Sequence, residues 1–361
     1  MDPVEIELPT YRILIARGAL AEVGRVASAT TRAHRYALIA DSNVAPLYAA
    51  RVRSALGEGR TRLYTISAGE EQKTRESWSA LTDSLLGDGF GRDSAIVALG
   101  GGVVGDLAGF IAATYMRGIP FLQLPTTLLA MIDASIGGKT GVDTPAGKNL
   151  VGAFHDPAAV IADPDVLRTL PPEHLRAGLA EGIKHGVIAD ASHFDEIVGV
   201  APEIVSGSRA AAAALERIVV RSVSIKADVV RRDHRESGIR KTLNFGHTIG
   251  HAIELGSYYR MLHGEAVAVG MVIESRMAER LGVAEPGTSE RILGAVERAG
   301  LPAARPPQQP PAAIVAATRH DKKARAGVVE YALPARIGEM AGADHGWGVA
   351  VSDEVVLEAL Q

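Results

Sequence analysis

Residues 95–114 read AIVALGGGVVGDLAGFIAAT, an apolar run of strand length followed by glycines and then by a helical pattern. Gly100, Gly102 and Gly105 match the G-x-G-x-x-G spacing between a strand and a helix. Glycines there allow backbone N–H groups to approach a pyrophosphate at the helix N-terminus. However, no acidic residue ends a strand about 20 residues later, as dinucleotide-binding folds usually have. On this pattern alone, a nucleotide site and an ordinary tight turn are equally open.

Strand-like and helix-like segments alternate on both sides of this stretch. The alternation is typical of a largely parallel α/β sheet, in which ligands gather beyond the carboxyl ends of the strands. We predict strands at residues 11–16, 36–40, 63–66, 95–99, 121–124 and 160–162, with helices among them at 44–56, 75–87 and 104–114.

The pattern changes near Pro171, after which strand signals nearly vanish and long helical runs follow. We therefore predict an α/β, Rossmann-like N-terminal domain over residues 1–170 and an all-α C-terminal domain over residues 171–361. The expected elements of the second domain are helices at 173–187, 209–230, 241–255, 265–281, 290–299 and 354–360, a proline-rich loop at 301–311 and a late strand at 328–333.

Composition narrows the possible functions. The formal net charge of −4 gives no support for binding to nucleic acid or to an anionic membrane. The chain has no cysteine, so any metal must be held by histidine and carboxylate, which suits zinc or a similar divalent ion. The first fifteen residues do not resemble a signal peptide, and no run reaches the roughly 20 apolar residues of a membrane span. We therefore expect a soluble, cytoplasmic protein.

Three histidines mark the second half of the chain, in the segment RKTLNFGHTIGHAIELGSYYRMLHGE at residues 240–265. His247 and His251 are four residues apart within a helical pattern, so both imidazoles should share one helix face. Arg240 and Asn244 precede His247 by two turns and one turn of the same predicted helix. A lone HxxxH is more often an ordinary histidine pair than a metal site. The third histidine, His263, and the nearby Arg and Asn favour a site.

Other polar segments have both a functional and an ordinary interpretation. Residues 41–43 (DSN) and 69–73 (GEEQK) follow predicted strands and would reach a ribose or base, although each is more often a turn. Residues 133–141 (DASIGGKTG) and 147–149 (GKN) predict a glycine-rich loop that grips a phosphate, with solvated lysines as the alternative. Asp133 replaces the leading glycine of an NTPase P-loop, which excludes that motif. Glu181 and Lys184 share a predicted helix face, either as an ion pair or as part of a metal site.

These motifs occur together, and in the same order, in one family. The segments at residues 100–110 (GGGVVGDLAGF), 125–154 (PTTLLAMIDASIGGKTGVDTPAGKNLVGAF), 179–186 (LAEGIKHG), 243–254 (LNFGHTIGHAIE), 262–271 (LHGEAVAVGM) and 320–323 (HDKK) resemble the 3-dehydroquinate synthase family. The resemblance extends over roughly residues 41–338. It implies an NAD-binding α/β domain, a helical metal-binding domain that uses zinc or cobalt, and a homodimer.

The resemblance also implies roles for individual residues. It makes Glu181, His247 and His263 the metal ligands, and it makes His251 a substrate contact beside the metal. The implied NAD-binding residues are Asp41, Asn43, Glu70, Lys73, Gly101, Gly102, Val103, Asp106, Thr126, Thr127, Lys139, Lys148 and Thr169. The implied substrate-binding and catalytic residues are Arg117, Asp133, Lys139, Asn149, Lys184, Lys226, Arg240, Asn244, His251 and Lys322 or Lys323, with Arg117 reaching the site of the partner subunit.

The family's reaction converts 3-deoxy-D-arabino-heptulosonate 7-phosphate to 3-dehydroquinate and phosphate, a step of the shikimate pathway. It proceeds through transient oxidation by NAD, phosphate elimination, reduction and intramolecular aldol cyclisation. Three alternatives compete with it: another sugar-phosphate cyclase such as an amino-dehydroquinate synthase, a metal-dependent polyol or glycerol-phosphate dehydrogenase, and a non-catalytic nucleotide-binding protein. The carboxylate-facing pair Arg240 and Asn244 favours dehydroquinate over cyclases whose substrates lack a carboxylate, but does not distinguish the amino variant.

Overall fold

The computed structural model of the chain describes residues 2–145, 147–257, 260–319, 324–325 and 328–361. The chain divides into two compact units, Met1–Leu170 and Pro171–Gln361.

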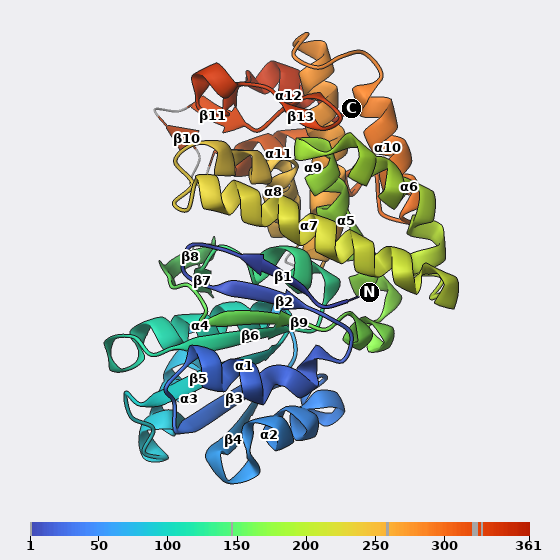
Figure 1. Cartoon of the computed structure of the whole chain (residues 1–361). Helices are drawn as coiled ribbons and strands as arrows, with labels where there is room; N and C mark the ends of the chain where they lie inside the picture. The colour runs from blue at the N-terminus through green and yellow to red at the C-terminus, as the bar shows by residue number, and fades with distance from the viewer. Residues whose placement is uncertain (1, 146, 258–259, 320–323, 326–327) are drawn as a thin grey trace. The chain divides into compact units, whose positions relative to one another are not determined.

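The first unit is built on a seven-stranded sheet with the strand order β1-β2-β9-β6-β5-β3-β4 (Figure 1). All six predicted strands are present, and they pair in parallel throughout. The strand that the sequence did not reveal is β1 (Val4–Glu7), which pairs antiparallel with β2 at the edge of the sheet. The predicted strands are β2 (Arg12–Ile15), β3 (Arg35–Asp41), β4 (Thr61–Ile66), β5 (Ser94–Gly100), β6 (Phe121–Pro125) and β9 (Ala159–Ala162).

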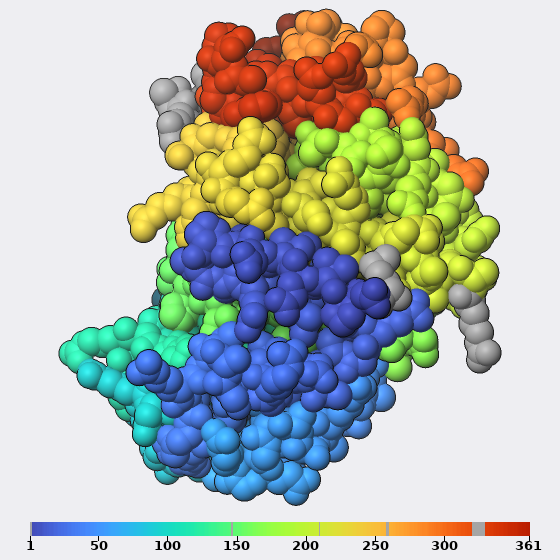
Figure 2. All heavy atoms as spheres, viewed as in Figure 1, coloured from blue at the N-terminus to red at the C-terminus, as the bar shows by residue number. Residues whose placement is uncertain are grey.

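Helices cover both faces of the sheet. Every residue of the central strand β5 is buried, as expected for a parallel strand covered on both sides. On one face, apolar residues of α3 (Arg75–Gly87) and α4 (Gly102–Thr114) form a core with β3, β4 and β5. The helices α1 (Val23–Thr30) and α2 (Ala50–Leu56) pack on each other and contact β9 and β4. In the space-filling view the first residues of the chain, including the edge strand β1, lie on the surface of this unit (Figure 2).

The predicted glycine-rich loop after Asp133 is instead a β-hairpin, formed by β7 (Lys139–Thr144) and β8 (Gly147–Phe154). Gly141 pairs with Gly152, and a Cβ on Gly152 would lie 2.1 Å from the carbonyl oxygen of Thr140. The two strands therefore approach each other where neither has a side chain. The hairpin was not predicted from the sequence because glycine and lysine, which are frequent in it, have low strand propensity.

The second unit is mainly helical, as predicted, so the predicted combination of an α/β domain and a helical domain is confirmed. It also contains short antiparallel strands near its C-terminus, in the sheets β10-β11-β14 and β12-β13. The sequence predicted only one strand in this region, at residues 328–333. The helices are α5 (Pro172–Ala189), α6 (Ala191–Val205), α7 (Ala212–Arg232), α8 (His247–Gly256), α9 (His263–Arg280), α10 (Thr288–Arg298), α11 (Pro311–Thr318) and α12 (Asp353–Ala359). The short strands are β10 (Ala324–Arg325), β11 (Val328–Tyr331), β12 (Pro334–Arg336), β13 (Glu339–Met340) and β14 (Val349–Ala350).

The prediction of one helix over residues 241–255 was wrong. A 3-10 helix over Ile239–Asn244 ends at Phe245, and α8 begins only at His247. Between them Gly246 has a left-handed backbone, with φ of 78°. A left-handed residue reverses the helical path, so Arg240 and Asn244 are not on the helix that carries His247. Among the described residues, no helix combines the length and the apolar character that a membrane span requires.

Candidate active site

In the α/β unit, the predicted nucleotide-binding residues follow the carboxyl ends of adjacent strands. The chain runs outward from β3 to β4 and then returns to β5 on the other side of β3, so the strand order reverses there. Such a switch point is where open α/β sheets bind ligands. Asp41 is the last residue of β3 and Gly100 is the last residue of β5. Thr126 and Thr127 follow β6 directly, and Glu70 and Lys73 follow β4.

Close packing explains why glycines stand between β5 and α4, since a Cβ at most of these positions would lie too near neighbouring side chains. A Cβ on Gly101 would lie 3.1 Å from Cγ2 of Thr127. A Cβ on Gly105 would lie 2.6 Å from Oε1 of Gln123, so this glycine lets α4 pack closely on β6. Gly102 is the first residue of α4, whose N-terminal amide groups favour an anion. These are the roles that glycines have in a dinucleotide-binding turn, and an NAD pyrophosphate fits the turn.

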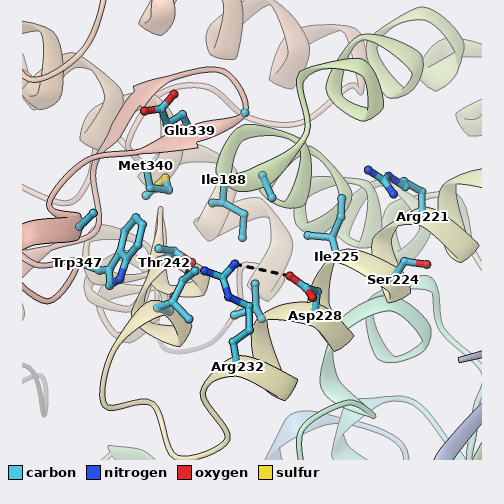
Figure 3. A pocket seen from close by; sticks show the side chains of 15 residues that line it. Ile188, Arg221, Ser224, Ile225, Asp228, Arg232, Thr242, Glu339, Met340 and Trp347 are labelled. Atoms are coloured by element: carbon cyan, nitrogen blue, oxygen red, sulfur yellow. Dashed lines mark hydrogen bonds and ion pairs between the residues drawn. The ribbon is translucent and has the colours of Figure 1, made fainter. Parts of the chain in front are cut away.

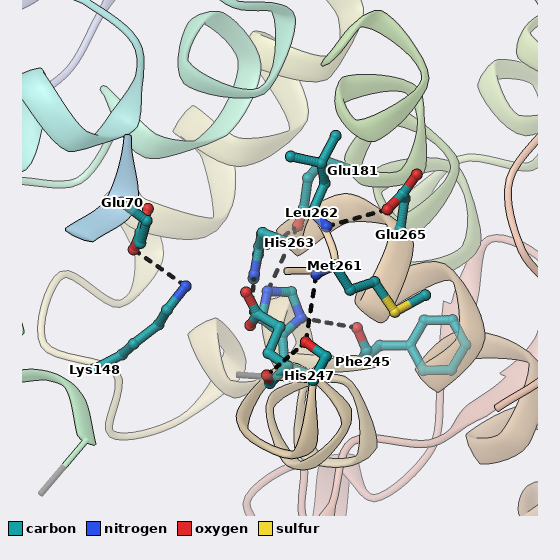
Figure 4. Close-up of polar contacts among 11 residues, drawn as sticks. Glu70, Lys148, Glu181, Phe245, His247, Met261, Leu262, His263 and Glu265 are labelled. Atoms are coloured by element: carbon teal, nitrogen blue, oxygen red, sulfur yellow. Dashed lines mark hydrogen bonds and ion pairs between the residues drawn. The ribbon is translucent and has the colours of Figure 1, made fainter. Parts of the chain in front are cut away.

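Paired charges lie beside this turn. Lys73 is buried, and its Nζ lies 2.5 Å from Oδ2 of Asp106 on α4. Burial alone would lower the pKa of Lys73, but the carboxylates of Asp106, Glu70 and Asp143 outweigh it and raise that pKa. Lys73 therefore stays charged. Nζ of Lys148, on β8, lies 3.1 Å from Oε1 of Glu70. Figure 4 shows the two side chains facing each other.

The remaining predicted residues of this unit are more dispersed. Oδ1 of Asp41 accepts the backbone N–H of Asn43 at 2.8 Å, which fixes the turn after β3. The Thr169 hydroxyl lies 2.7 Å from the Tyr48 hydroxyl. Asn149 and Arg117 are exposed and have positive φ angles of 54° and 66°. Non-glycine residues with such angles are uncommon and cluster at functional sites. Lys139 is exposed at the start of β7, Asp133 is half-buried, and Val103 is half-buried in the first turn of α4.

In the helical unit, a carboxylate and two imidazoles converge. Glu181 lies in the middle of α5 and is fully buried. Its Oε1 lies 3.5 Å from Nε2 of His247 and 3.4 Å from Nε2 of His263, and both imidazoles point toward it in Figure 4. One ligand atom from each of the three side chains lies within 4.8 Å of the others. Two imidazole nitrogens and one carboxylate oxygen are a donor set that binds zinc and leaves a coordination position open.

The second nitrogen of each imidazole has a partner that directs Nε2 toward the cluster. Nδ1 of His247 lies 3.1 Å from the Phe245 carbonyl oxygen, and Nδ1 of His263 lies 3.2 Å from Oε2 of Glu254. An imidazole that donates from Nδ1 presents the lone pair of Nε2 to a metal. Glu254 was not predicted, although it stands seven residues after His247 in the same apolar helical pattern, where a carboxylate is unexpected.

The two imidazoles differ in proton affinity. Burial, followed by the charge of Lys184, lowers the pKa of His247 well below its ordinary value, so it is neutral. Burial also acts to lower the pKa of His263, but Glu254 and Glu181 outweigh it and raise that pKa to about 10. A divalent cation would therefore replace a proton at His263, as metal binding to histidine generally does.

Three further predicted residues lie in the helical unit, and two of them contact the cluster. The Lys184 ammonium forms an ion pair with Oε2 of Glu181, and both side chains are buried. The His251 ring lies 5.3 Å from the His247 ring, so the predicted shared face of these two histidines is confirmed. Lys226, on α7, is buried as well.

Two acidic residues that were not predicted hold the segment before α8. Arg240 is 1% exposed, and its backbone N–H donates to Oδ2 of Asp233 at 3.0 Å. Nη1 of Arg240 donates to the His234 carbonyl oxygen at 2.5 Å. Nδ2 of Asn244 donates to Oε1 of Glu236 at 2.7 Å, and Glu236 has a positive φ of 60°. The predicted Lys322 and its neighbour Lys323 lie outside the described residues.

A separate cavity of about 460 Å³ lies in the helical unit, against α7 and the β12–β13 hairpin (Figure 3). Ile225 and Val229 of α7 contribute to its walls, together with Met340 and Trp347. None of the described residues that line it belongs to the predicted site. Ile239 and Thr242, which do line it, stand one residue before and two residues after Arg240 in the chain.

The two units and their polar clusters define a class of protein. Similarity to solved structures identifies that class. The chain is similar over its whole length to a 2-deoxy-scyllo-inosose synthase solved with carbaglucose-6-phosphate, NAD+ and Co2+, with a TM-score of 0.86, 27% identity and 99% coverage of each chain. It is equally similar to 2-epi-5-epi-valiolone synthase of Streptomyces hygroscopicus subsp. jinggangensis 5008, solved with NAD+ and Zn2+, with a TM-score of 0.86, 30% identity and coverage of 98% and 97%. The class is that of the sugar-phosphate cyclases.

Sequence comparison identifies the family within that class. Residues 63–177 match the model of the 3-dehydroquinate synthase N-terminal domain, and residues 178–324 match that of the C-terminal domain. The 3-dehydroquinate synthase of Symbiobacterium thermophilum is 46% identical over 345 residues, which cover 93% of this chain and 94% of that protein. The chain belongs to the 3-dehydroquinate synthase family, which confirms the resemblance seen in the sequence.

Proposed function

We propose that the chain converts 3-deoxy-D-arabino-heptulosonate 7-phosphate to 3-dehydroquinate and phosphate, with NAD in the α/β unit and a divalent metal in the helical unit. The observation that carries the proposal is the cluster of Glu181, His247 and His263 in a member of this family. When bound, NAD+ would accept a hydride and return it, and zinc or cobalt would act as a Lewis acid on the substrate hydroxyls. Both groups occur in solved cyclases that are similar to this chain.

The α/β unit supplies the groups for the nucleotide and the phosphate. The turn at Gly101 and Gly102 accepts the pyrophosphate, and Asp41 lies at the switch point, where a ribose would bind. Lys73 is held by Asp106 in a charged state near the same strand ends. Lys139 and Asn149, on the hairpin, provide a cation and an amide for the substrate phosphate.

The helical unit supplies the groups for the carboxylate and the hydroxyls. Arg240 is buried, and its Nη1 donates to the His234 carbonyl oxygen, so its guanidinium has a defined direction for a carboxylate. Lys226 and Asn244 assist it. Lys184, which pairs with Glu181, is placed to move a proton on and off a substrate hydroxyl, and we assign a similar orienting role to Asp133.

We also propose that the chain works as a homodimer in which Arg117 serves the partner subunit. Arg117 is exposed and has a positive φ of 66° in the turn after α4, followed by Gly118 with φ of 110°. This turn presents the guanidinium outward. A Lys substitution at Arg117 should lower activity without changing NAD binding, and it should be complemented in mixed dimers with a His247→Ala chain.

One assay tests the function. The purified chain, supplied with the heptulosonate phosphate, trace NAD+ and zinc, should release phosphate continuously without accumulating NADH. Absence of phosphate release would contradict the proposal. In a second reaction with NAD+ in excess, NADH formed in proportion to the substrate would identify a polyol-type dehydrogenase instead. Parallel reactions with the 4-amino-4-deoxy analogue distinguish an amino-dehydroquinate synthase, which would prefer the amino substrate.

A further inference from the structure

Glu274 is a fully buried carboxylate on α9, at the end of the otherwise apolar run AVAVGMVIE at residues 266–274. Its Oε2 accepts the backbone N–H of Gly246 at 2.6 Å, and its Oε1 accepts the backbone N–H of Ile249 at 3.0 Å. Both N–H groups belong to the start of α8. A side chain of α9 therefore caps the N-terminus of the neighbouring helix.

The start of α8 needs a cap from elsewhere because residue 246 cannot supply one. A Cβ at Gly246 would lie 2.5 Å from Cγ of Met271 and 2.8 Å from the carbonyl oxygen of Val267. The Ser, Thr or Asp that usually caps a helix is therefore excluded at that position. Glu274 satisfies amide groups that the close packing of α8 on α9 would otherwise leave buried without partners.

This cap bears on the proposed metal ligands. His247 is the first residue of α8, between the two amides that Glu274 accepts from. His263 is the first residue of α9, the helix that carries Glu274. We propose that Glu274 is a positioning residue for the metal, because it fixes His247 of α8 relative to His263 through bonds that originate on α9. The inference rests on the proposed metal site.

The chemistry of a carboxylate suits this role. Both of its oxygens accept hydrogen bonds, and its negative charge interacts favourably with the N-terminal end of the helix dipole. The amide of a glutamine has the same shape but only one acceptor, so its NH2 group would face one of the two backbone N–H groups. A Glu274→Gln substitution thus loosens one anchor without opening a cavity. Glu274→Asp keeps the charge but shortens the reach.

The test measures zinc affinity by competition with a chromophoric chelator and the visible absorption of the cobalt-substituted chain. The matched control is Asp190→Asn, since Oδ1 of Asp190 caps α6 through the backbone N–H groups of Ser192 at 3.0 Å and His193 at 3.1 Å. We expect Glu274→Gln to weaken zinc binding by about 10- to 100-fold, as loss of a supporting group around a metal site does, and to alter the cobalt spectrum. Asp190→Asn should leave both unchanged.

The outcomes separate the two proposals. If Glu274→Gln lowers stability as Asp190→Asn does but leaves the zinc affinity within twofold, Glu274 is only a structural cap and the inference fails. If Glu274→Gln does not fold, the zinc affinity of Glu274→Asp is measured instead. Weaker zinc binding by Glu274→Asp supports the inference, and unchanged binding overturns it. If the unaltered chain binds no zinc, the metal site itself fails, and the inference fails with it.

Discussion

The two helices that carry the proposed histidine ligands begin in different ways. Each starts at its histidine, α8 at His247 and α9 at His263. At α9 the cap is local, because Oε2 of Glu265 accepts the backbone N–H of Leu262 at 3.1 Å within the same turn. At α8 the cap comes from Glu274, 25 residues after Ile249 in the chain. One histidine is therefore placed by its own sequence and the other by packing.

The starts also differ in what supports the imidazole. Nδ1 of His247 faces a backbone carbonyl, whereas Nδ1 of His263 faces the buried carboxylate of Glu254. A carboxylate partner raises the basicity of a ligating histidine more than a carbonyl does. A metal at this cluster would thus have one more basic and one less basic imidazole ligand, together with Glu181.

The largest expected effect comes from removing a ligand. His247→Ala should lower zinc affinity by more than about 100-fold, beyond the loss expected for a supporting residue. His251→Ala, four residues further along the same helix, should retain zinc and lose turnover. Metal content after gel filtration, together with phosphate release, measures both. If His251→Ala loses its zinc as well, the assignment of His251 as a substrate contact and not a ligand is wrong.

The left-handed start of α8 can be tested at Gly246. Gly246→Ala should destabilise the chain by about 3 kcal/mol, because a left-handed alanine costs about 1–2 kcal/mol and the clash with Met271 adds overpacking. Gly287 precedes α10 with a similar φ of 87°, and a Cβ added to it would have no atom within 4 Å. Gly287→Ala should therefore lower the free energy of unfolding only by the cost of a left-handed alanine. Urea unfolding of the metal-free chain measures both. Equal costs would show that packing does not force the glycine at the start of α8.

The support of His263 gives a smaller effect. Glu254→Gln keeps the size of the side chain and removes its charge, so zinc affinity should fall by about 10- to 100-fold. Glu265→Gln, which alters the local cap of α9 but does not contact the imidazole ring, serves as the control and should change zinc affinity less than threefold. A larger loss for Glu265→Gln would mean that α9, like α8, depends on its cap to place the ligand. Isothermal titration with zinc gives both values.

These helix starts also show how far the sequence could predict the structure. The parallel strands were predictable because each is a short apolar run that must be buried on both faces, as in β5. The spacing of His247 and His251 predicted their shared helix face for a similar local reason. The break at Gly246 was not predictable, because the apolar period continues through it and the glycine is required by close packing against Met271 on another helix.

The supporting residues of the site lay beyond the sequence patterns for the same reason. Glu254 and Glu274 are single acidic residues in apolar helical runs. The neighbouring sequence does not indicate which histidine or which helix N-terminus each of them contacts. The hairpin β7–β8 was interpreted as a loop because Gly141 and Gly152 lie opposite each other, a pairing visible only in three dimensions. The resemblance to the family supplied candidate residues that spacing alone did not, such as the assignment of Glu181 and His263 with His247.

The start of α6 gives the smallest expected effect, and it serves as a control for the comparison of α8 with α9. In the first turn of α6, His193 is buried, and its Nε2 lies 2.9 Å from the hydroxyl of Ser222. Burial, aided by His185, lowers the pKa of His193 to about 4, so the folded chain holds it neutral while the unfolded chain binds a proton below about pH 6.5. Stability should therefore fall as the pH drops below 6.5 and level off near pH 4.

Between pH 7 and pH 5.5, which is one pH unit below the unfolded pKa, the unfolding free energy should fall by about 1.2 kcal/mol from this group. His193→Gln keeps a group that can bond to Ser222 but does not titrate, so its unfolding free energy should lack this part of the decline. The measurement is the difference between the two chains in urea unfolding across that range, in which the titrations common to both cancel. Parallel pH profiles for the two chains would contradict the prediction. They would mean that the first turn of α6 admits a charged imidazole as readily as the start of α9 does at His263.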